Sequence, residues 1–180
     1  MDKSKRYFLT GSGMVVFLVL LVFSARFLQG GEASVSSHNL KVKGLKTTPI
    51  HVIVYSDFQC PACKAVLEPV ENLRKEFADS VQLEFRHFPL ERPHRWALTA
   101  ASFAECAAEQ GKFWEFHDRV YLEQPAWSVS PDVISIFAHY SRELGLDPQK
   151  LSDCLGDPKT LTEIRKERSS GERKGVQSTP

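Results

Sequence analysis

The chain has 180 residues, a formal net charge of +1 at pH 7 and 42% hydrophobic residues. This length and composition are typical of one folded domain together with a membrane or targeting segment. Basic residues are interleaved with acidic ones and form no dominant patch, which argues against a nucleic-acid partner.

The N-terminus differs from the rest of the chain. Residues 1–6 carry three basic side chains, and residues 7–28 are mainly apolar. Positive charge before an apolar run predicts a cytoplasmic N-terminus and export of the residues C-terminal to the run. The run approaches the roughly 20 residues that span a bilayer, and Gly31-Glu32-Ala33 offers small residues for cleavage, so a signal anchor and a signal peptide both remain possible. We favour an anchor, and either outcome places the domain in the periplasm or on the outer face of the cytoplasmic membrane.

Residues 29–48 are rich in Gly, Ser and Lys, which predicts a linker that runs into a short edge strand at best. The domain is then expected at 49–180. Residues 51–55 carry consecutive apolar side chains, a pattern typical of a strand buried on both faces. A helix should begin at Cys60 and continue to Phe77 with a kink at Pro69.

Residues 81–88 alternate apolar and polar side chains, and one helix separates them from the first strand. This arrangement predicts a parallel βαβ unit. A helical insertion at about 93–170 comes next, with proline, glycine and aspartate signals for its helices. The expected helices are 96–110, 113–122, a third that starts after Ser130-Pro131-Asp132 and ends at Gly145, and two that start at Asp147-Pro148 and Asp157-Pro158.

The motif Cys60-Pro61-Ala62-Cys63 directly follows the first strand and opens the helix. Two thiols at this spacing on a first helical turn indicate a dithiol/disulfide redox centre. Free N–H groups and the macrodipole at the helix N-terminus stabilise a thiolate, which favours Cys60 as the reactive sulfur. Cys63 is expected one turn inside the helix, where it is sheltered from substrate.

Two other interpretations of this motif are disfavoured. Half of a zinc site would need a second cysteine pair at close spacing, and Cys106 and Cys154 lie far apart in the sequence. A permanent structural disulfide does not suit the strand-turn-helix setting. In an exported domain, Cys106 and Cys154 are expected to form a structural disulfide, the alternative being two buried free thiols.

Other polar and aromatic side chains are predicted to have structural roles. Asp57 could accept a proton during exchange, but a turn or cap role is favoured. His87, His94 and His117 have no ligand partners at suitable spacing, so packing is favoured over metal binding or base catalysis, and no metal or cofactor is expected. The aromatic residues of 96–116 are expected to form the core of the insertion, although part of them could line a substrate groove.

Three motifs in order carry a family resemblance. They are residues 55–63 around the two cysteines, Phe85-Arg86-His87-Phe88-Pro89-Leu90, and residues 110–117. Together they resemble the DsbA-like thiol:disulfide oxidoreductases of the thioredoxin superfamily. The resemblance implies an α/β thioredoxin-like fold with an inserted helical domain, and an exported protein that handles substrate disulfides. It also implies a membrane redox partner of the DsbB or vitamin K epoxide reductase type.

In the family a Thr-Pro or Val-Pro pair with a cis proline faces the cysteines, and Thr179-Pro180 matches it as a substrate-binding element. The family's last two strands and final helix do not occur within residues 1–180. We therefore expect the fold to be truncated after the cis-Pro position, with strand 51–55 short of one neighbour and a trans bond at Pro180. Residues 1–180 alone are expected to unfold without a sharp transition and to lack normal exchange activity.

These observations predict an extracytoplasmic thiol:disulfide oxidoreductase that acts on unfolded or reduced exported proteins through Cys60 and Cys63, as an oxidase. The most oxidising relatives have a histidine between the cysteines, whereas this chain has Pro61-Ala62, which implies a weaker oxidant. A reductase or isomerase of lower potential is the alternative within the same chemistry. A non-catalytic polypeptide-binding module is the alternative outside it.

Overall fold

The computed structural model of the protein describes residues 40–180. Its elements in chain order are β1 (Val42–Lys43), β2 (Ile50–Ser56), α3 (Pro61–Ala65), α4 (Leu67–Glu76), β3 (Val81–His87), α5 (Ala97–Glu109), α6 (Phe113–Leu122), α7 (Gln124–Trp127), α8 (Val133–Glu143), α9 (Pro148–Gly156) and α10 (Pro158–Arg173). The basic segment 1–6 and the apolar segment 7–28 lie outside the described residues. Between residues 40 and 180 no helix is both long and apolar enough to cross a membrane.

The sheet of the described residues has the order β1-β3-β2. β2 pairs with β3 in parallel, from Ile50 opposite Val81 to Ser56 opposite His87, so the predicted βαβ unit is confirmed. β1 pairs antiparallel with β3. The short edge strand expected at the end of the linker is present as β1, so the sheet begins before residue 49, and the Lys41 carbonyl accepts a hydrogen bond from Phe85 N at 2.9 Å.

Burial of the two longer strands is the reverse of the prediction. β2 is only partly buried and Ile50 is 51% exposed, whereas β3 is buried at six of its seven positions. β3 has neighbours at both edges, while β2 has one among the described residues. The alternating pattern of residues 81–88 predicted one exposed face. The polar side chains are buried instead, because Gln82 donates from Nε2 to the Leu45 carbonyl and Glu84 pairs with Arg86.

The helix after the cysteines breaks at Val66, three residues before the predicted kink at Pro69. Val66 caps the C-terminus of α3 and the N-terminus of α4. A proline ring clashes with the carbonyl four residues earlier, here that of Ala65, and lacks the N–H that would bond to it. The proline therefore acts one turn before its own position.

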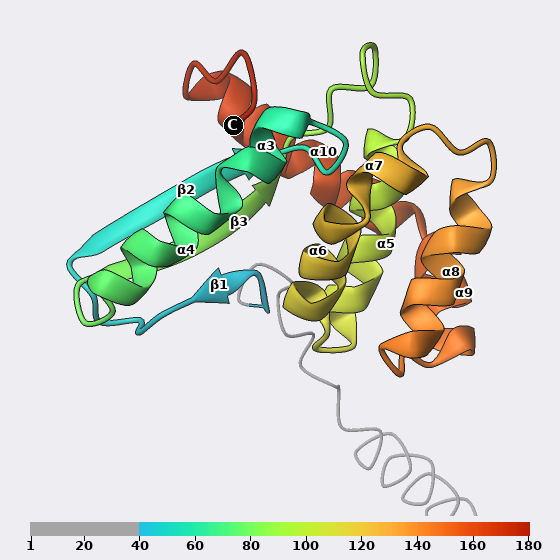
Figure 1. Ribbon diagram of the computed structural model, residues 1–180, viewed down its shortest axis with the longest axis horizontal. Coiled ribbons are helices and arrows are strands. Elements are labelled where there is room, and N and C mark those ends of the chain that lie inside the picture. The colour runs from blue at the N-terminus through green and yellow to red at the C-terminus, as the bar shows by residue number, and fades with distance from the viewer. Residues whose placement is uncertain (1–39) are drawn as a thin grey trace, which may run out of the picture. The chain divides into compact units, whose positions relative to one another are not determined.

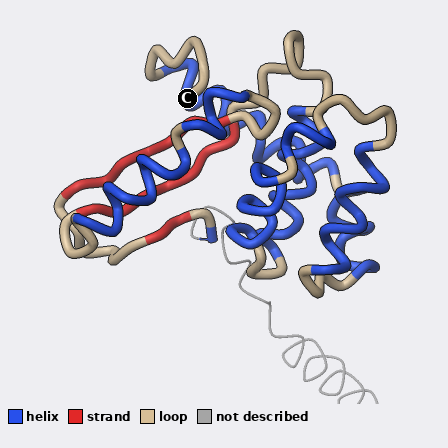
Figure 2. Tube along the Cα trace, viewed as in Figure 1, coloured by secondary structure: helices blue, strands red, loops and turns tan. Residues whose placement is uncertain are grey.

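Helices of the insertion begin and end close to the predicted residues, and α7 is the one that the sequence analysis missed. The glycines after α5 and α8, Gly111 and Gly145, have φ values of 70° and 75°, which suits their role in ending helices. In Figure 1, α4 lies along β2 and β3 while α5, α6, α8 and α9 pack together beyond one end of the sheet. Figure 2 shows the same division between a strand-containing part and an all-helical part.

α4 and α10 cover opposite faces of the sheet. Successive strand residues point to opposite faces. Tyr55 lies against α10, where its hydroxyl is 3.4 Å from Ser170 Oγ. Its neighbours Val54 and Ser56 line a cavity with residues of α4. The cysteine-bearing turn therefore stands at the end of a strand that is covered on both sides.

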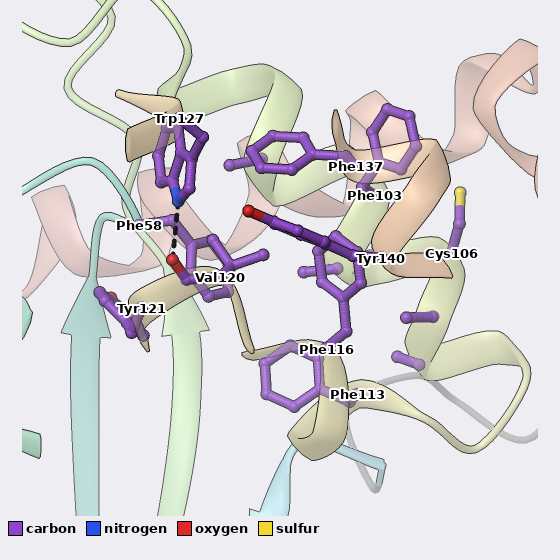
Figure 3. Packing of buried hydrophobic residues seen from close by; sticks show 14 of the residues in the cluster. Phe58, Phe103, Cys106, Phe113, Phe116, Val120, Tyr121, Trp127, Phe137 and Tyr140 are labelled. Carbon is purple, nitrogen blue, oxygen red and sulfur yellow. Dashed lines mark hydrogen bonds between the residues drawn. The ribbon is translucent and has the colours of Figure 1, made fainter. Parts of the chain in front are cut away.

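Aromatic side chains fill the insertion (Figure 3). Phe103, Phe116, Phe137 and Trp127 are at most 3% exposed, and Trp127 Nε1 donates to the Val120 carbonyl at 2.7 Å. The predicted core role is confirmed for Phe103, Phe113 and Phe116. Trp96 and Trp114, in contrast, are half-buried, and Trp114 lines a cavity. Aromatic pairs of this kind add about 0.5–1.5 kcal/mol each beyond the burial of their area.

A buried charge network that the sequence analysis did not foresee joins three parts of the fold. Lys41 Nζ lies 2.6 Å from Glu105 Oε2 and 2.6 Å from Glu167 Oε1. His87 donates its backbone N–H to Glu167, and its Nε2 lies 3.2 Å from Glu105 Oε2. Lys41 precedes β1, His87 ends β3, and the two carboxylates come from α5 and α10. The network therefore fixes the sheet against the helical insertion.

Cys106 in α5 and Cys154 in α9 form a disulfide, with Cα atoms 5.7 Å apart and a sequence separation of 48. We expect the double variant C106A/C154A to lower the free energy of unfolding by about 2–4 kcal/mol, because the bridge restricts the unfolded chain. Urea unfolding of the full-length protein measures this. Peptide mapping under non-reducing conditions checks the pairing, and alkylatable thiols at both positions in fresh protein would contradict it.

Candidate redox site

The two cysteines of the motif lie where β2 gives way to α3. Cys60 is the N-cap of α3, Pro61 is its first residue, and Cys63 lies one turn inside. Both thiols are free, and Cys60 is 6% exposed whereas Cys63 is fully buried. Cys60 therefore stands at the end of α3 where the first helical N–H groups lie, and its sulfur is the more accessible of the two.

Thr179 and Pro180 lie next to Cys60. The Cys60 thiol approaches the Thr179 carbonyl at 3.6 Å, and the Thr179-Pro180 bond is cis. The trans bond expected for a free tail is therefore wrong, because that expectation left out the contact with Cys60. The Thr179 hydroxyl is buried and forms no hydrogen bond of normal geometry. The structure thus brings together the four residues that the sequence analysis assigned to catalysis and substrate binding.

Burial raises the pKa of Cys63. The backbone of Asp57 and the hydroxyls of Ser56 and Thr179 oppose this shift without cancelling it. Since desolvation disfavours a thiolate, a Cys63 sulfur that leaves a disulfide as an anion gains stability when it takes up a proton.

The Asp57 carboxylate holds the turn before the cysteines. It accepts hydrogen bonds from Gln59 N at 2.7 Å and Leu90 N at 2.8 Å, and lies 2.8 Å from His94 Nδ1. Both oxygens are therefore engaged with the turn and the loop after β3. This geometry agrees with the turn role that the sequence analysis favoured over proton transfer.

Two glutamines tie the cysteine turn to the insertion, and the sequence analysis missed both. Gln59 Nε2 donates to the Ser128 carbonyl at 3.0 Å, and its Oε1 accepts from Trp96 N at 2.8 Å. Gln124 Nε2 donates to the carbonyls of Phe58 and Cys60 at 2.7 Å and 3.0 Å. Partners so distant in sequence leave no local pattern, so no sequence signal could have found these contacts.

The three histidines singled out in the sequence do not meet at one point. His87 faces Glu105, His94 faces Asp57, and His117 Nδ1 lies 2.7 Å from Asp118 Oδ1. Within residues 40–180, no group of three or more His, Cys, Asp or Glu side chains is placed to hold a metal ion.

A cavity of about 340 Å³ opens beside Cys63, between α4, the sheet and α6. Its lining combines an apolar floor with charged side chains, and Lys43 Nζ lies 4.2 Å from the centre of the Trp114 ring. The lining residues are Lys43, Val54, Ser56, Cys63, Val66, Leu67, Glu68, Val70, Glu71, Lys75, Leu83, Phe85, Trp114, His117 and Asp118.

A family model described as thioredoxin matches residues 37–180, which include every described element. The chain belongs to the thioredoxin family. The family resemblance stated from the motifs and the predicted thioredoxin-like fold class with inserted helices are thereby confirmed.

Solved structures place this thioredoxin-family chain within the DsbA-like form of the fold. Alpha-DsbA1 of Wolbachia pipientis has a TM-score of 0.66 at 22% identity, over 78% of this chain and 71% of that one. BdbD of Bacillus subtilis, in its oxidised form, has a TM-score of 0.68 at 20% identity, over 78% of each chain. At these identities the likeness shows the fold.

Curated relatives of this thioredoxin-family chain carry another name. The Na(+)/H(+) antiporter NhaA 3 of Salinispora tropica is 33% identical over 139 residues, which are 77% of this chain and 20% of that protein. NhaA 1 of Mycolicibacterium gilvum is 40% identical over 83 residues, or 46% of this chain and 14% of that protein. The chain spans about a fifth or less of the length of these relatives, so their antiport is a property of far longer proteins.

Proposed function

We propose that this chain is a protein thiol:disulfide oxidoreductase that exchanges disulfides with exported polypeptides through Cys60 and Cys63. The observation that carries the proposal is the placement of Cys60 at the N-terminus of α3, with Cys63 buried one turn behind it and Thr179 opposite. Disulfide exchange requires one accessible sulfur that a substrate can attack and one sheltered sulfur that leaves.

The reaction begins from the Cys60–Cys63 disulfide. A substrate thiolate attacks the Cys60 sulfur, a substrate–Cys60 disulfide forms, and the bond between the two cysteines breaks with its electron pair on Cys63. A second substrate thiolate then attacks the substrate sulfur of this mixed disulfide and releases Cys60. The substrate ends oxidised by two electrons and the two cysteines end as thiols, the form seen in the structure.

We further propose that the protein acts outside the cytoplasm as an oxidase, anchored by residues 7–28. Support comes from the basic residues before that apolar segment and from the even number of cysteines, four, which suits an oxidising compartment. An oxidase that has been reduced needs an electron acceptor. A membrane protein of the DsbB or vitamin K epoxide reductase type would take these electrons.

The test compares the two directions of exchange in the full-length protein. The oxidised protein is mixed with a reduced dithiol peptide, and the reduced protein with the same peptide as a disulfide, at equal concentrations. An oxidase gives faster and more complete reaction in the first mixture, whereas a reductase or isomerase favours the second. Absence of exchange in both mixtures, with binding of the peptide retained, would contradict the proposal and indicate a polypeptide-binding module.

A further inference from the structure

Disulfide exchange requires the buried Cys63 sulfur to gain and to lose a proton. The sulfur is fully buried, and burial raises its pKa. Each cycle nevertheless delivers one proton to Cys63 when it leaves and removes one when it attacks. The sulfur lies beside a cavity that Cys63, Ser56 and His117 line together, so these protein groups and water in the cavity can carry the proton.

Ser56 is the first of these groups. It lines the same cavity as Cys63, its hydroxyl lowers the pKa of the Cys63 thiol against the effect of burial, and that hydroxyl lies 2.8 Å from the Tyr121 hydroxyl. Either oxygen of that pair can be the donor, and the Tyr121 hydroxyl also donates to the Asp57 carbonyl at 3.2 Å. A hydroxyl both donates and accepts, so Ser56 can pass a proton in either direction without becoming charged. The cavity is large and polar enough to hold water.

His117 is the group that can hold the proton. Its ring centre lies 4.9 Å from that of Tyr121, one helical turn away on α6, and it lines the same cavity as Ser56 and Cys63. Asp118 fixes its Nδ1, and Nε2 has no hydrogen-bond partner among residues 40–180. Burial lowers the pKa of His117 against the opposing effect of Asp118, so the ring is neutral near pH 7 and holds a proton only transiently.

The other ionisable groups around the cavity are less suited to this task. They are Asp118 and Tyr121 on α6, Lys43 on β1, His87 on β3, and Glu68, Glu71 and Lys75 on α4. The hydrogen bond from Arg74 lowers the pKa of Glu71, and the hydrogen bond with His117 lowers the pKa of Asp118 against the effect of burial. Burial raises the pKa of Tyr121 well above 10.0. Weakly basic carboxylates and a phenol that stays protonated are poor terminal acceptors at neutral pH.

We propose that Ser56 and His117 form the proton path of Cys63, with Ser56 as the relay and His117 as the group that holds the proton. The inference rests on the proposed exchange reaction and adds the route by which the proton reaches and leaves Cys63. The proton enters and leaves through the cavity between α4 and α6, on the buried side of α3, while substrate meets Cys60 on the other. His117 acts through Ser56 and water and does not touch the sulfur.

The test measures rates in both directions for full-length wild type and His117→Gln. The oxidised protein reacts with reduced glutathione and the reduced protein with oxidised glutathione, followed by acid quench and thiol labelling from pH 5 to 9. We expect both rates to fall by the same factor, at least about tenfold. The equilibrium constant should stay unchanged, and the inflection due to His117 should vanish from the pH profile. A structural perturbation would change the two rates unequally.

Controls separate the possible outcomes. His139→Gln removes an exposed histidine of α8 that pairs with Glu143, and should leave both rates within about twofold of wild type. Asp118→Asn changes a side chain that is 65% exposed and should move the inflection to lower pH, which keeps the idea testable if His117→Gln does not fold. Wild-type rates and pH profile in His117→Gln would overturn the proton path alone. Absence of exchange in wild type would overturn the proposed function.

Discussion

Replacing Cys60 with serine in the full-length protein reduces disulfide exchange to the uncatalysed rate, and replacing Cys63 with serine makes mixed disulfides accumulate. A serine oxygen cannot take the place of the attacked sulfur at position 60. At position 63 the loss removes the internal thiol that would otherwise displace the substrate from Cys60. Non-reducing electrophoresis with a disulfide-bonded peptide detects the adducts, which dithiothreitol should remove.

The matched control adds C106A/C154A to Cys63→Ser, which removes the other two cysteines and should leave adduct formation at Cys60 intact. If adducts accumulate with Cys60→Ser and not with Cys63→Ser, the two cysteines have exchanged roles. The exposure and helix position of Cys60 would then be poor guides to its reactivity.

The second large effect is expected at the buried charge network. Replacing Lys41 with methionine leaves the carboxylates of Glu105 and Glu167 without their shared cation, and Lys41 is 1% exposed at its side chain. Breaking a buried ion pair on one side costs about 3–5 kcal/mol of stability. Urea unfolding of the full-length protein measures this loss.

A surface lysine provides the comparison for Lys41→Met. Lys166 pairs with Glu163 and its side chain is 65% exposed, so Lys166→Met should cost less than about 1 kcal/mol. Equal losses in the two variants would show that the network contributes no more than a surface pair. A double variant, Lys41→Met with Glu105→Leu, should recover part of the loss because fewer charges remain buried without partners.

The same network predicts how stability depends on pH. Burial alone would raise the pKa of Glu105, but hydrogen bonding with His87 and the charge of Lys41 hold it well below its usual range. In the unfolded chain the carboxyl takes up a proton near pH 4.3, so below about that pH the unfolded state binds more protons than the folded one. The free energy of unfolding should therefore fall as pH decreases from about 5 to 3.

Urea unfolding of wild type and Glu105→Gln at a series of pH values isolates this contribution. The glutamine does not titrate, so the variant should lose stability less steeply as the pH falls over that range. Parallel curves for the two proteins would show that Glu105 does not control the acid response.

Local features of the sequence were enough to predict most of the helices, with α7 and the break at Val66 as the exceptions. Gly111 and Gly145 end helices, and Asp147 and Asp157 cap the helices that begin at the prolines after them. Pro61 marks the start of α3, because a proline at the first helical position loses no hydrogen bond and presets the helical φ angle.

Contacts between distant residues could not be predicted in this way. Lys41 looked like part of a polar linker, yet it is buried because carboxylates from α5 and α10 surround its ammonium group. The alternation in β3 suggested a solvated face, but on that face Arg86 donates to Ser170 of α10 and Gln82 donates to the Leu45 carbonyl. Gln59 and Gln124 hold the cysteine turn through carbonyls or amides more than 30 residues away. A linear pattern records which side chains are polar and does not record which partners reach them.

Equilibration of the full-length protein with buffers of reduced and oxidised glutathione tests the central claim most directly. Acid quench and thiol labelling of Cys60 and Cys63 give the fraction oxidised at each ratio. Our account predicts that the pair passes from dithiol to disulfide within the accessible range of ratios, reversibly, while Cys106 and Cys154 stay bonded throughout. A Cys60–Cys63 bond that resists every ratio, or that never forms, would contradict it.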